Sequence, residues 1–425
     1  MKLLIRQGRV VDPVTGIGGM MDLLIEDGKI AYLGSHAPHD ADETIDANGW
    51  VVSAGLVDMH VHLREPGFEY KETIATGCEA AARGGFTSIA CMPNTKPVAD
   101  SPEVLELIRE KAAAACGVNV WPIGAVTMGE KGERLADFEA LRAAGAVAFS
   151  DDGCPVQNAN LMRDALICAA QQERTVLSHC EDLDMVGNRA VNEGRISRRL
   201  RIDGRPAIAE ELQVMRVAML AEETESAVHI CHISTARSVA IVRRYKKKGV
   251  AITCETCPQY FTLTEEEILE QGSMARVNPP LRTAADVEGI IAGLKDGTID
   301  AIATDHAPHS AEEKARPLTE APSGMVGLET ALAVTLTELY HTGKLELSDI
   351  LRKLTFNPAC ILRIPKGRIA VGGVADLTLF DPDEEWVIAP ERFASKGRNT
   401  PFAGRSVKGR VKCTIVNGTI IYREG

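Results

Sequence analysis

Both ends of the chain show the hydrophobic pattern of β-hairpins. Residues 21–26 and 29–33 flank Asp27-Gly28, and residues 411–416 and 419–422 flank Asn417-Gly418. Asp-Gly and Asn-Gly between apolar runs are typical of two-residue hairpin turns. Hydrophobic and polar positions also alternate at residues 375–380. We therefore expect residues 1–55 and 360–425 to build one composite β-domain.

Between these ends, short apolar runs alternate with longer amphipathic segments. Eight runs resemble buried strands: residues 56–62, 87–91, 118–123, 146–149, 175–179, 227–232, 250–254 and 300–304. Helix signals lie between them, such as Ser101-Pro102 before a helical run and the capping-box pattern at Thr264–Glu267. Eight β–α alternations predict an α/β fold with a (β/α)8 barrel, which we place at residues 56–359.

The composition excludes several partners and locations. A formal net charge of −12 over 425 residues argues against a nucleic-acid or anionic-membrane surface, although one pocket can still attract a small anionic substrate. The 11 cysteines are odd in number and lack a framework spacing, which suits reduced thiols. Arg6 interrupts the first apolar run, and no run has the length of a membrane span. We expect a cytoplasmic protein.

The first barrel strand ends in a candidate metal motif. Because side chains on a strand alternate between its faces, His60 and His62 point the same way. Two imidazoles on one face suit a metal such as zinc, although a lone pair can also be accidental. Arg64 continues the same face and would hold an anionic group beside the metal.

Further metal-ligand types follow other predicted strands. His179 ends the fifth strand, His232 the sixth and Asp305 the eighth, while Asp151-Asp152 follow the fourth. Barrel active sites lie at this edge, so these side chains should converge with His60 and His62. Four imidazoles and two carboxylates could hold two metals around a bridging carboxylate and a water of near-neutral pKa. Spacing alone does not decide between Asp151 and Asp152.

Other polar residues have simpler interpretations. His229 and His306 should face away from the neighbouring ligands, His306 supporting the site from behind. His36, His39, His341 and the Arg198–Arg205 stretch look like surface. Cys254-x-x-Cys257 is weak evidence for a zinc or redox site, because no second pair matches it.

Several motifs together resemble those of dihydroorotases, in the amidohydrolase superfamily. They are His60–Gly67, Gly84–Thr87, Cys91–Thr95, Phe149–Gly153, Asn278–Arg282, Asp305–His309 and Phe356–Ala359. The resemblance covers nearly the whole chain. It implies a zinc-dependent cyclic amide hydrolase that interconverts N-carbamoyl-L-aspartate and L-dihydroorotate in pyrimidine synthesis.

The resemblance also implies roles for individual residues. His60, His62 and Asp305 would hold one zinc, His179 and His232 the second, and Asp152 would bridge them. Asp305 would also be the catalytic base and acid. The substrate would contact His62, Arg64, Asn94, Asn278, His309, Ser323 and Gly324. The family usually has Pro-Phe-Gly where this chain has Pro322-Ser323-Gly324, which leaves the role of the Phe ring without a counterpart. Some dihydroorotases of this type hold a single zinc tightly, so occupancy of the second site stays open.

Two alternatives remain. Hydantoinases, dihydropyrimidinases and allantoinases are related cyclic amidases, and Glu255-Thr256-Cys257-Pro258 resembles the hydantoinase sequence; they use a carboxylated lysine as the bridge, and the fourth strand end has no lysine. Non-catalytic dihydroorotase-like subunits of aspartate transcarbamoylase complexes lack several ligands that this chain keeps. We expect a homo-oligomer, with a complex with aspartate transcarbamoylase as an open question.

Overall fold

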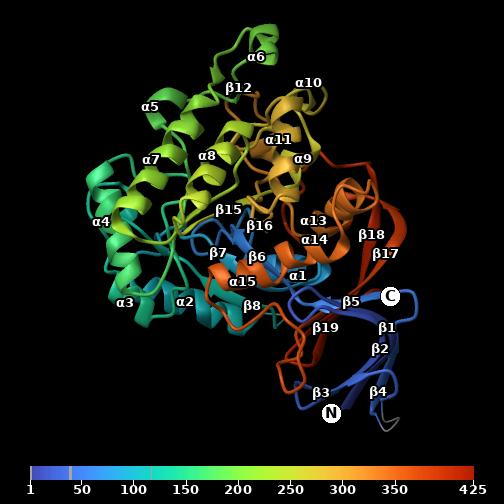
Figure 1. Ribbon diagram of the computed structural model, residues 1–425. Coiled ribbons are helices and arrows are strands. Elements are labelled where there is room, and N and C mark those ends of the chain that lie inside the picture. Colours follow the sequence, from blue (N-terminus) through green and yellow to red (C-terminus); the bar gives the residue numbers. More distant parts are fainter. Residues whose placement is uncertain (1, 38–40, 116) are drawn as a thin grey trace.

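The computed structural model describes residues 2–37, 41–115 and 117–425. The middle of the chain forms a barrel of parallel strands with helices around it, and both termini lie in a β-sheet at its side (Figure 1). The α/β barrel with a β-sheet from both chain ends confirms the predicted fold class. No helix of the described segments is long and apolar enough to cross a membrane.

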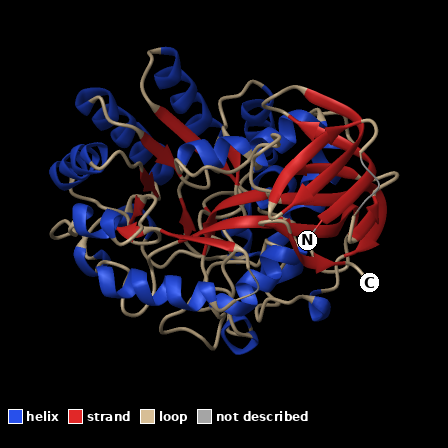
Figure 2. Ribbon diagram, turned by 90° about the horizontal axis from the view of Figure 1, so that it is seen from below, coloured by secondary structure: helices blue, strands red, loops and turns tan. Residues whose placement is uncertain are grey.

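The β-domain joins the two ends of the chain strand by strand. Its sheet has the order β19-β18-β17-β5-β1-β2-β3, with β4 also pairing β1. The bounds are β1 Lys2–Asp12, β2 Ile17–Glu26, β3 Lys29–Gly34, β4 Glu43–Asp46, β5 Val51–Ala54, β17 Leu377–Val387, β18 Ser406–Val416 and β19 Thr419–Arg423. Figure 2 shows both N and C at the side of the molecule that this sheet forms. β5 is the junction, because it pairs β1 on one side and β17 on the other.

Both predicted hairpin turns are present. Glu26 pairs Lys29 around Asp27-Gly28, and Val416 pairs Thr419 around Asn417-Gly418. All four turn residues have positive φ, between 48° and 79°, as a type I′ turn requires. The two turns also touch: a Cβ on Gly418 would lie 2.6 Å from the Gly28 Cα. Glycine is therefore required in this turn by both conformation and space.

The barrel strands lie where the sequence places them, with shifted ends. They are β6 Leu56–Val61, β7 Phe86–Cys91, β8 Asn119–Pro122 continued by β9 Gly124–Ala125, β10 Phe149–Ser150, β11 Val176–Ser178, β14 Val228–Ile230, β15 Ile252–Thr256 and β16 Ala301–Ile302. Neighbouring strands pair in parallel. The bridge from Val61 to His306 joins the first strand to the segment that follows the last strand, β16, and closes the ring. A pair of two-residue strands, β12 Val191–Asn192 and β13 Gly204–Arg205, lies outside it.

Helices surround the ring and cover its outer face (Figure 1). The α-helices are α1 Ile74–Arg83, α2 Pro102–Ala113, α3 Phe138–Ala143, α4 Ala159–Gln171, α5 Leu183–Val186, α6 Arg195–Leu200, α7 Ile208–Thr224, α8 Ala236–Lys247, α9 Pro258–Thr262, α10 Glu267–Gln271, α11 Ala284–Lys295, α12 Ala311–Lys314, α13 Ala331–Thr335, α14 Leu347–Leu354 and α15 Phe356–Ile361. The 3₁₀-helices are η1 Met128–Glu130, η2 Gly272–Ala275 and η4 Pro390–Arg392, and η3 Leu336–Tyr340 is a π-helix.

Two helix starts test the predicted caps. α2 begins at Pro102 after Ser101, as predicted, although the Ser101 side chain makes no capping bond. The capping box at Thr264–Glu267 is wrong, because α10 begins only at Glu267 with Glu266 before it. The Glu267 carboxylate, which would complete the box, instead accepts a hydrogen bond from Arg405 Nη2 at 2.7 Å. A tertiary contact has taken the side chain that the local pattern assigned to the helix cap.

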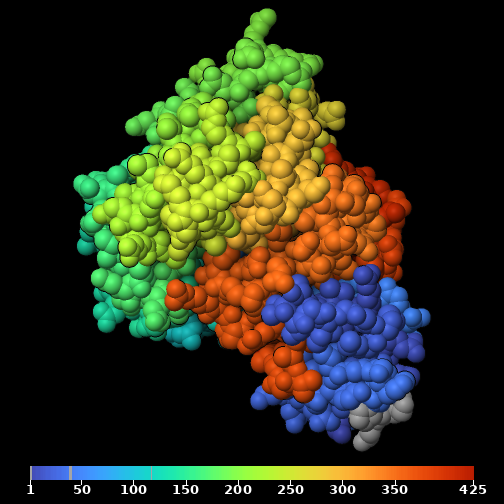
Figure 3. Space-filling view, in the orientation of Figure 1, coloured from blue at the N-terminus to red at the C-terminus, as the bar shows by residue number. Residues whose placement is uncertain are grey.

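The β-domain and the barrel share a tightly packed boundary. Phe380 of β17 and Val411 of β18 belong to the apolar core between barrel strands and helices. Leu362 and Ile364 pack with barrel-interior residues such as Met59 and Ala90. In the space-filling view, the N-terminal lobe lies directly against C-terminal segments and the barrel (Figure 3). The β-domain thus supports the barrel from the side while the carboxyl edge of the strands stays available for a site.

Candidate active site

The six predicted metal-ligand residues meet at the carboxyl edge of the barrel. His60 lies in β6 and His62 follows it, while the other four follow β10, β11, β14 and β16: Asp152, His179, His232 and Asp305. All six are buried, with His60 completely inaccessible to solvent. Strand order therefore brings together residues that are separated by up to 245 positions, as the barrel interpretation requires.

Asp152 lies at the centre of the cluster. Its Oδ1 is 3.4 Å from His60 Nε2, 3.4 Å from His179 Nδ1 and 3.5 Å from His232 Nε2. Its Oδ2 is 3.4 Å from His62 Nε2. One carboxylate thus faces all four imidazoles, which is the position that a bridging ligand needs.

Asp305 completes the other side. Its Oδ1 lies 3.1 Å from His62 Nε2 and 3.6 Å from His60 Nε2. Donor atoms close enough to share one ion form the groups His60–His62–Asp305 and Asp152–His179–His232. These two groups match the ligand sets that the sequence resemblance implied.

The donor set fits metal ions on two observations. Nitrogen and oxygen ligands at about 2.1 Å from a tetrahedral ion lie roughly 3.4 Å apart, close to the separations of 3.1 to 3.6 Å here. Among the described residues, His60 Nε2, Asp152 Oδ1 and both ring nitrogens of His179 are buried without a hydrogen-bond partner. Buried polar atoms are rarely left unpaired, so this arrangement is consistent with a binuclear metal centre.

The structure also separates the two adjacent aspartates. Asp151 Oδ1 accepts hydrogen bonds from the backbone N–H groups of Val126 and Thr127, at 2.8 and 3.0 Å. Asp151 therefore ties its loop to the preceding barrel strand, whereas Asp152 faces the histidines. Burial raises the pKa of Asp151 to about 6, against the hydrogen bonds that lower it.

Neighbouring polar groups fix the imidazole orientations. Glu255 Oε1 lies 2.7 Å from His60 Nδ1, and Asn94 Oδ1 lies 2.9 Å from His62 Nδ1. Each contact orients the ring so that Nε2 faces the two carboxylates. On the other side, Glu181 Oε2 is 3.5 Å from His179 Nε2. Hydrogen-bonded partners such as Glu255 and Asn94 hold a metal-binding histidine in one tautomer and raise its basicity.

The charges within the cluster affect one another strongly. Burial alone would raise the pKa of Asp152, but the charge of His60 and the nearby imidazoles of His179 and His232 hold it well below its usual range. Burial opposes the charged form of His60 as well, yet the Asp152 charge raises the pKa of His60 well above its ordinary value. The site therefore keeps Asp152 ionised and favours a positive charge at its centre.

Three site residues have backbone conformations that L-residues rarely adopt. Arg64 has φ of 62°, His232 of 33° and Asp305 of 48°. Such left-handed conformations cost about 1 to 3 kcal/mol each when the surroundings impose them. They occur just after strands β6, β14 and β16, where the chain turns so that the side chain faces the centre.

The cluster of metal-ligand residues opens into a cavity of about 180 Å³. Every predicted substrate-contacting residue lines it: His62, Arg64, Asn94, Asn278, His309, Ser323 and Gly324. Arg64 Nε donates to the Pro308 carbonyl oxygen at 3.3 Å, and its Nη2 lies 3.4 Å from His309 Nε2. Burial, followed by the charges of Arg64 and Lys71, lowers the pKa of His309 to about 2, so this imidazole is neutral. The cavity presents cations and neutral donors beside the metal cluster.

Some contributors could not be recognised in the sequence. Arg205 was predicted to be solvated and is instead buried, with Nη1 donating to Glu181 Oε1 at 2.9 Å and to the Asn278 side chain. Glu255 lies inside the Cys-x-x-Cys pattern, whose cysteines join none of the metal-ligand groups found among the described residues. A cationic residue in a loop that returns to the barrel gives no local signal of its burial.

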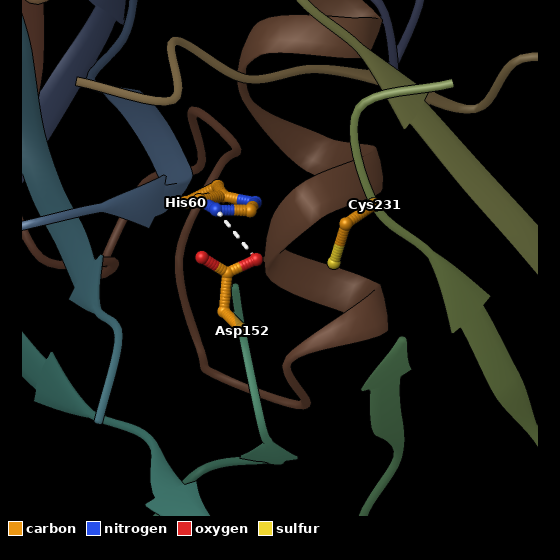
Figure 4. Close-up of side chains that lie close together, drawn as sticks. All are labelled: His60, Asp152 and Cys231. Carbon is orange, nitrogen blue, oxygen red and sulfur yellow. Dashed lines mark ion pairs between the residues drawn. The ribbon is translucent and has the colours of Figure 1, made fainter. Parts of the chain in front are cut away.

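Cys231 is a further unpredicted neighbour. Its thiol lies near His60 and Asp152 in a third group of close donor atoms (Figure 4). Burial raises the pKa of this thiol well above its ordinary value, which keeps it protonated. Cys91, Cys231, Cys254 and Cys257 are among the free thiols of the described segments, in keeping with the odd and scattered set.

The other histidines lie outside the cluster. His229 contacts Thr253 Oγ1 at 2.8 Å and Glu255 Oε2 at 3.3 Å, so its role is structural. His306 points to Glu72 Oε2 at 3.3 Å. His36 is exposed, whereas His341 is half-buried with Nε2 2.8 Å from the Pro382 carbonyl oxygen. His39 lies outside the described residues.

Comparison with known proteins gives consistent results. A family model described as Dihydro-orotase-like matches residues 49–238. The chain is 53% identical to a dihydroorotase of Pelotomaculum thermopropionicum, covering 100% of this chain and 99% of that protein. It is 49% identical to a dihydroorotase of Syntrophus aciditrophicus, covering all of both chains.

Solved structures with a similar fold come from related amidases. The L-hydantoinase of Arthrobacter aurescens superimposes with a TM-score of 0.90 at 25% identity, covering 100% of this chain and 96% of that one. The dihydropyrimidinase of Brevibacillus agri gives a TM-score of 0.87 at 26% identity, covering 100% and 95%. The barrel and the sheet from both chain ends are thus an amidohydrolase architecture.

Proposed function

The chain belongs to the dihydroorotase family of the amidohydrolase superfamily, and we propose that its barrel cavity interconverts N-carbamoyl-L-aspartate and L-dihydroorotate by metal-dependent chemistry with Asp305 as the proton carrier. The observation that carries this proposal is the placement of Arg64 beside the six-residue metal cluster in one cavity. A guanidinium there suits a cyclic amide that bears a carboxylate.

Zinc is the metal that we propose for the cluster. His60, His62 and Asp305 would hold one ion, His179 and His232 a second, and Asp152 would bridge the two. Imidazole and carboxylate donors suit zinc, which when bound lowers the pKa of water and polarises a carbonyl oxygen. Glu255 and Asn94 would keep the Nε2 atoms of His60 and His62 aimed at this position.

Asp305 is the group that moves the proton in this proposal. Its Oδ1 faces His62, and no hydrogen bond to a described residue engages its Oδ2. Asp305 would accept a proton from the attacking water and return it to the ring nitrogen that leaves. In the direction of ring closure, the same carboxylate would run these transfers in reverse.

The cavity wall orients the substrate. Arg64, Asn94 and His309 would bind its carboxylate, and Asn278 would contact the ring, with backbone groups of Ser323 and Gly324 beside it. Because His309 is neutral, it adds no second charge next to Arg64. These contacts would hold the substrate ring in one position and orientation relative to the metal-ligand residues. Such positioning supplies a large part of the rate enhancement of an enzyme.

The decisive experiment is a parallel assay of purified protein with dihydroorotate, hydantoin and dihydrouracil, with metal content measured on the same sample. We expect turnover of dihydroorotate and little of the other two, because they lack the carboxylate that Arg64 would bind. Faster turnover of hydantoin or dihydrouracil would identify a different cyclic amidase. That alternative is less compatible with Asp152 at the bridging position, where no lysine is present.

Arg64→Met should lower dihydroorotate turnover on the order of tenfold or more, since about 1.4 kcal/mol of lost binding suffices for that factor. Metal content should stay at the wild-type level, because Arg64 supplies no donor to either group and contacts Pro308 and His309 instead. Arg174→Met is the matched control: this part-buried arginine donates to the Ala146 carbonyl oxygen away from the cavity. Wild-type kinetics in the Arg64 variant would remove it as the carboxylate anchor.

Assembly is a separate part of the proposal. We propose a homo-oligomer, and we keep association with aspartate transcarbamoylase as a hypothesis for copurification to test. Neither a nucleic-acid nor a membrane partner is proposed, in keeping with the net charge of −12.

A further inference from the structure

Lys314 is a buried charge that the proposed chemistry does not use. It ends helix α12, and only 1% of its surface is exposed. Lysine is almost never buried this completely unless its ammonium is paired. No carboxylate among the described residues forms an ion pair with it, so its partners must be sought elsewhere.

Three backbone carbonyl groups satisfy the ammonium. Lys314 Nζ donates to the oxygen of Pro322 at 3.1 Å, of Gly324 at 3.1 Å and of Arg276 at 3.3 Å. An ammonium has three N–H donors and no acceptor, so three carbonyls match it fully. Burial, followed by the charge of Arg276, lowers the pKa of Lys314 to about 7. Hydrogen bonds to carbonyl oxygens favour the charged form of a lysine.

Two of these three carbonyls belong to the turn Pro322–Gly324, whose residues Ser323 and Gly324 line the substrate cavity. Ser323 accepts a hydrogen bond on its carbonyl oxygen from His309 Nε2 at 2.9 Å. The Ser323 side chain, where the family usually has Phe, accepts one from Arg276 Nε at 3.2 Å. The turn therefore positions His309 directly, and Arg276 binds the residue that departs from the family pattern.

The direction of one peptide unit follows from the same contacts. In a trans peptide the carbonyl and the next N–H point in opposite directions. Because the Pro322 carbonyl points to Lys314, the Ser323 N–H points away from it, and this N–H makes no hydrogen bond to a described residue. Gly324 has φ of 137°, and a Cβ there would lie 3.0 Å from His309 Nε2. The turn is thus both oriented and closely packed against His309.

We propose that Lys314 is a positioning residue for substrate binding: its buried ammonium holds the turn Pro322–Gly324 so that the Ser323 N–H and His309 face the anionic substrate. This inference rests on the proposed function for its substrate, but the ordering of the turn is a property of the chain itself. Lys314 does not touch the substrate; it acts through the backbone of the turn.

The test compares two buried lysines. Lys314→Met keeps the length of the side chain and removes the three donors. Lys353→Met is the matched control, because Lys353 is also buried and donates to one carbonyl, that of Ile299, at 2.6 Å. Each metal-loaded variant is measured for KM and kcat with dihydroorotate, for thermal stability and for hydrogen exchange at the Gly324 N–H, which bonds the Arg276 carbonyl oxygen at 2.9 Å.

For Lys314→Met we expect faster exchange at Gly324 and a KM raised on the order of tenfold, the effect of about 1.4 kcal/mol, with a smaller change in kcat. For Lys353→Met we expect lower stability with wild-type KM and wild-type exchange at Gly324. Unchanged exchange in Lys314→Met, or a KM equal to that of the control, would overturn the proposal. If Lys314→Met does not fold, Lys314→Gln, which keeps two donors, should show both effects in weaker form.

The exchange measurement also separates this proposal from the proposed function. Wild-type protein that fails to turn over dihydroorotate would refute the function. Faster exchange at Gly324 in the Lys314→Met variant of that same protein would still support the role of Lys314 in holding the turn Pro322–Gly324.

Discussion

Asp305→Asn should lower the rate by roughly 10² to 10⁴, the usual contribution of a general acid–base group. The substitution keeps the size of the side chain and one oxygen that can face His62, but it removes the carboxylate that accepts a proton. Because one group serves hydrolysis and ring closure, both directions should fall by the same factor. Ring closure consumes a proton, so lower pH should still favour the cyclic product in wild-type and variant enzyme alike.

Rates in both directions, pH–rate profiles and metal content together test this prediction. The limb of the wild-type profile that reports the base should be missing from the residual activity of the variant. Asp300→Asn is a suitable control, since Asp300 binds Lys246 Nζ at 2.6 Å before the same strand and away from the cavity. Suppose that Asp305→Asn retains metal and more than about a tenth of the wild-type rate. This loss would be smaller than the one expected for a general acid–base group, and Asp305 would then be only a ligand. His309 would then be the next proton carrier to test.

Removal of bound metal should abolish turnover, because the four histidines and two aspartates present buried donor atoms to one another with few other partners. Adding zinc after prolonged chelation should restore activity. It should also raise the thermal midpoint, since free metal at about 100 times Kd stabilises the folded state by ~2.7 kcal/mol.

Magnesium is the informative control for that experiment. It is a hard ion that prefers oxygen ligands in octahedral geometry, so a cluster rich in imidazole should bind it poorly. Recovery with zinc and none with magnesium is the expected result. Full activity in protein verified to be free of metal would end the metal-dependent mechanism.

The strands and the strand-end ligands could be predicted because both depend on local sequence. Apolar runs marked each barrel strand, and His60 and His62 fell on one face through the two-residue period. The same reasoning could not separate Asp151 from Asp152, because adjacent residues on a loop have no fixed period. The distinction comes from the Val126 and Thr127 N–H groups, which follow the neighbouring strand and bind Asp151.

Residues that act through long-range contacts were missed for a related reason. Arg205 lies in a charged stretch that is typical of a solvated loop, and its burial depends on Glu181 and Asn278 arriving from two other segments. Lys314 follows two glutamates in a short helix, and no pattern near it in the sequence predicts that its ammonium binds three backbone carbonyls. Charged side chains reveal their burial only once the fold has placed their acceptors.

The strand β5 pairs with one strand that is synthesised before it and one that is synthesised long after it. One edge of β5 pairs β1, which is already made, but the other edge pairs β17. The bond from Leu56 N–H to Thr378 Oγ1 next to it joins residues 322 positions apart. At 5 to 20 residues per second, a ribosome needs roughly 15 to 65 s to supply that partner.

During this interval the barrel can close, since the bridge from Val61 to His306 needs no later residue. The sheet cannot be completed in this interval, because the core cluster that contains Leu3 and Ile5 also needs Leu377. An unpaired strand edge is a template for wrong pairing. The nascent protein therefore passes through a state in which the barrel strands can pair but the sheet stays open. The last fifty or so residues to be made complete both the sheet and, through Phe380 and Val411, the core that it shares with the barrel.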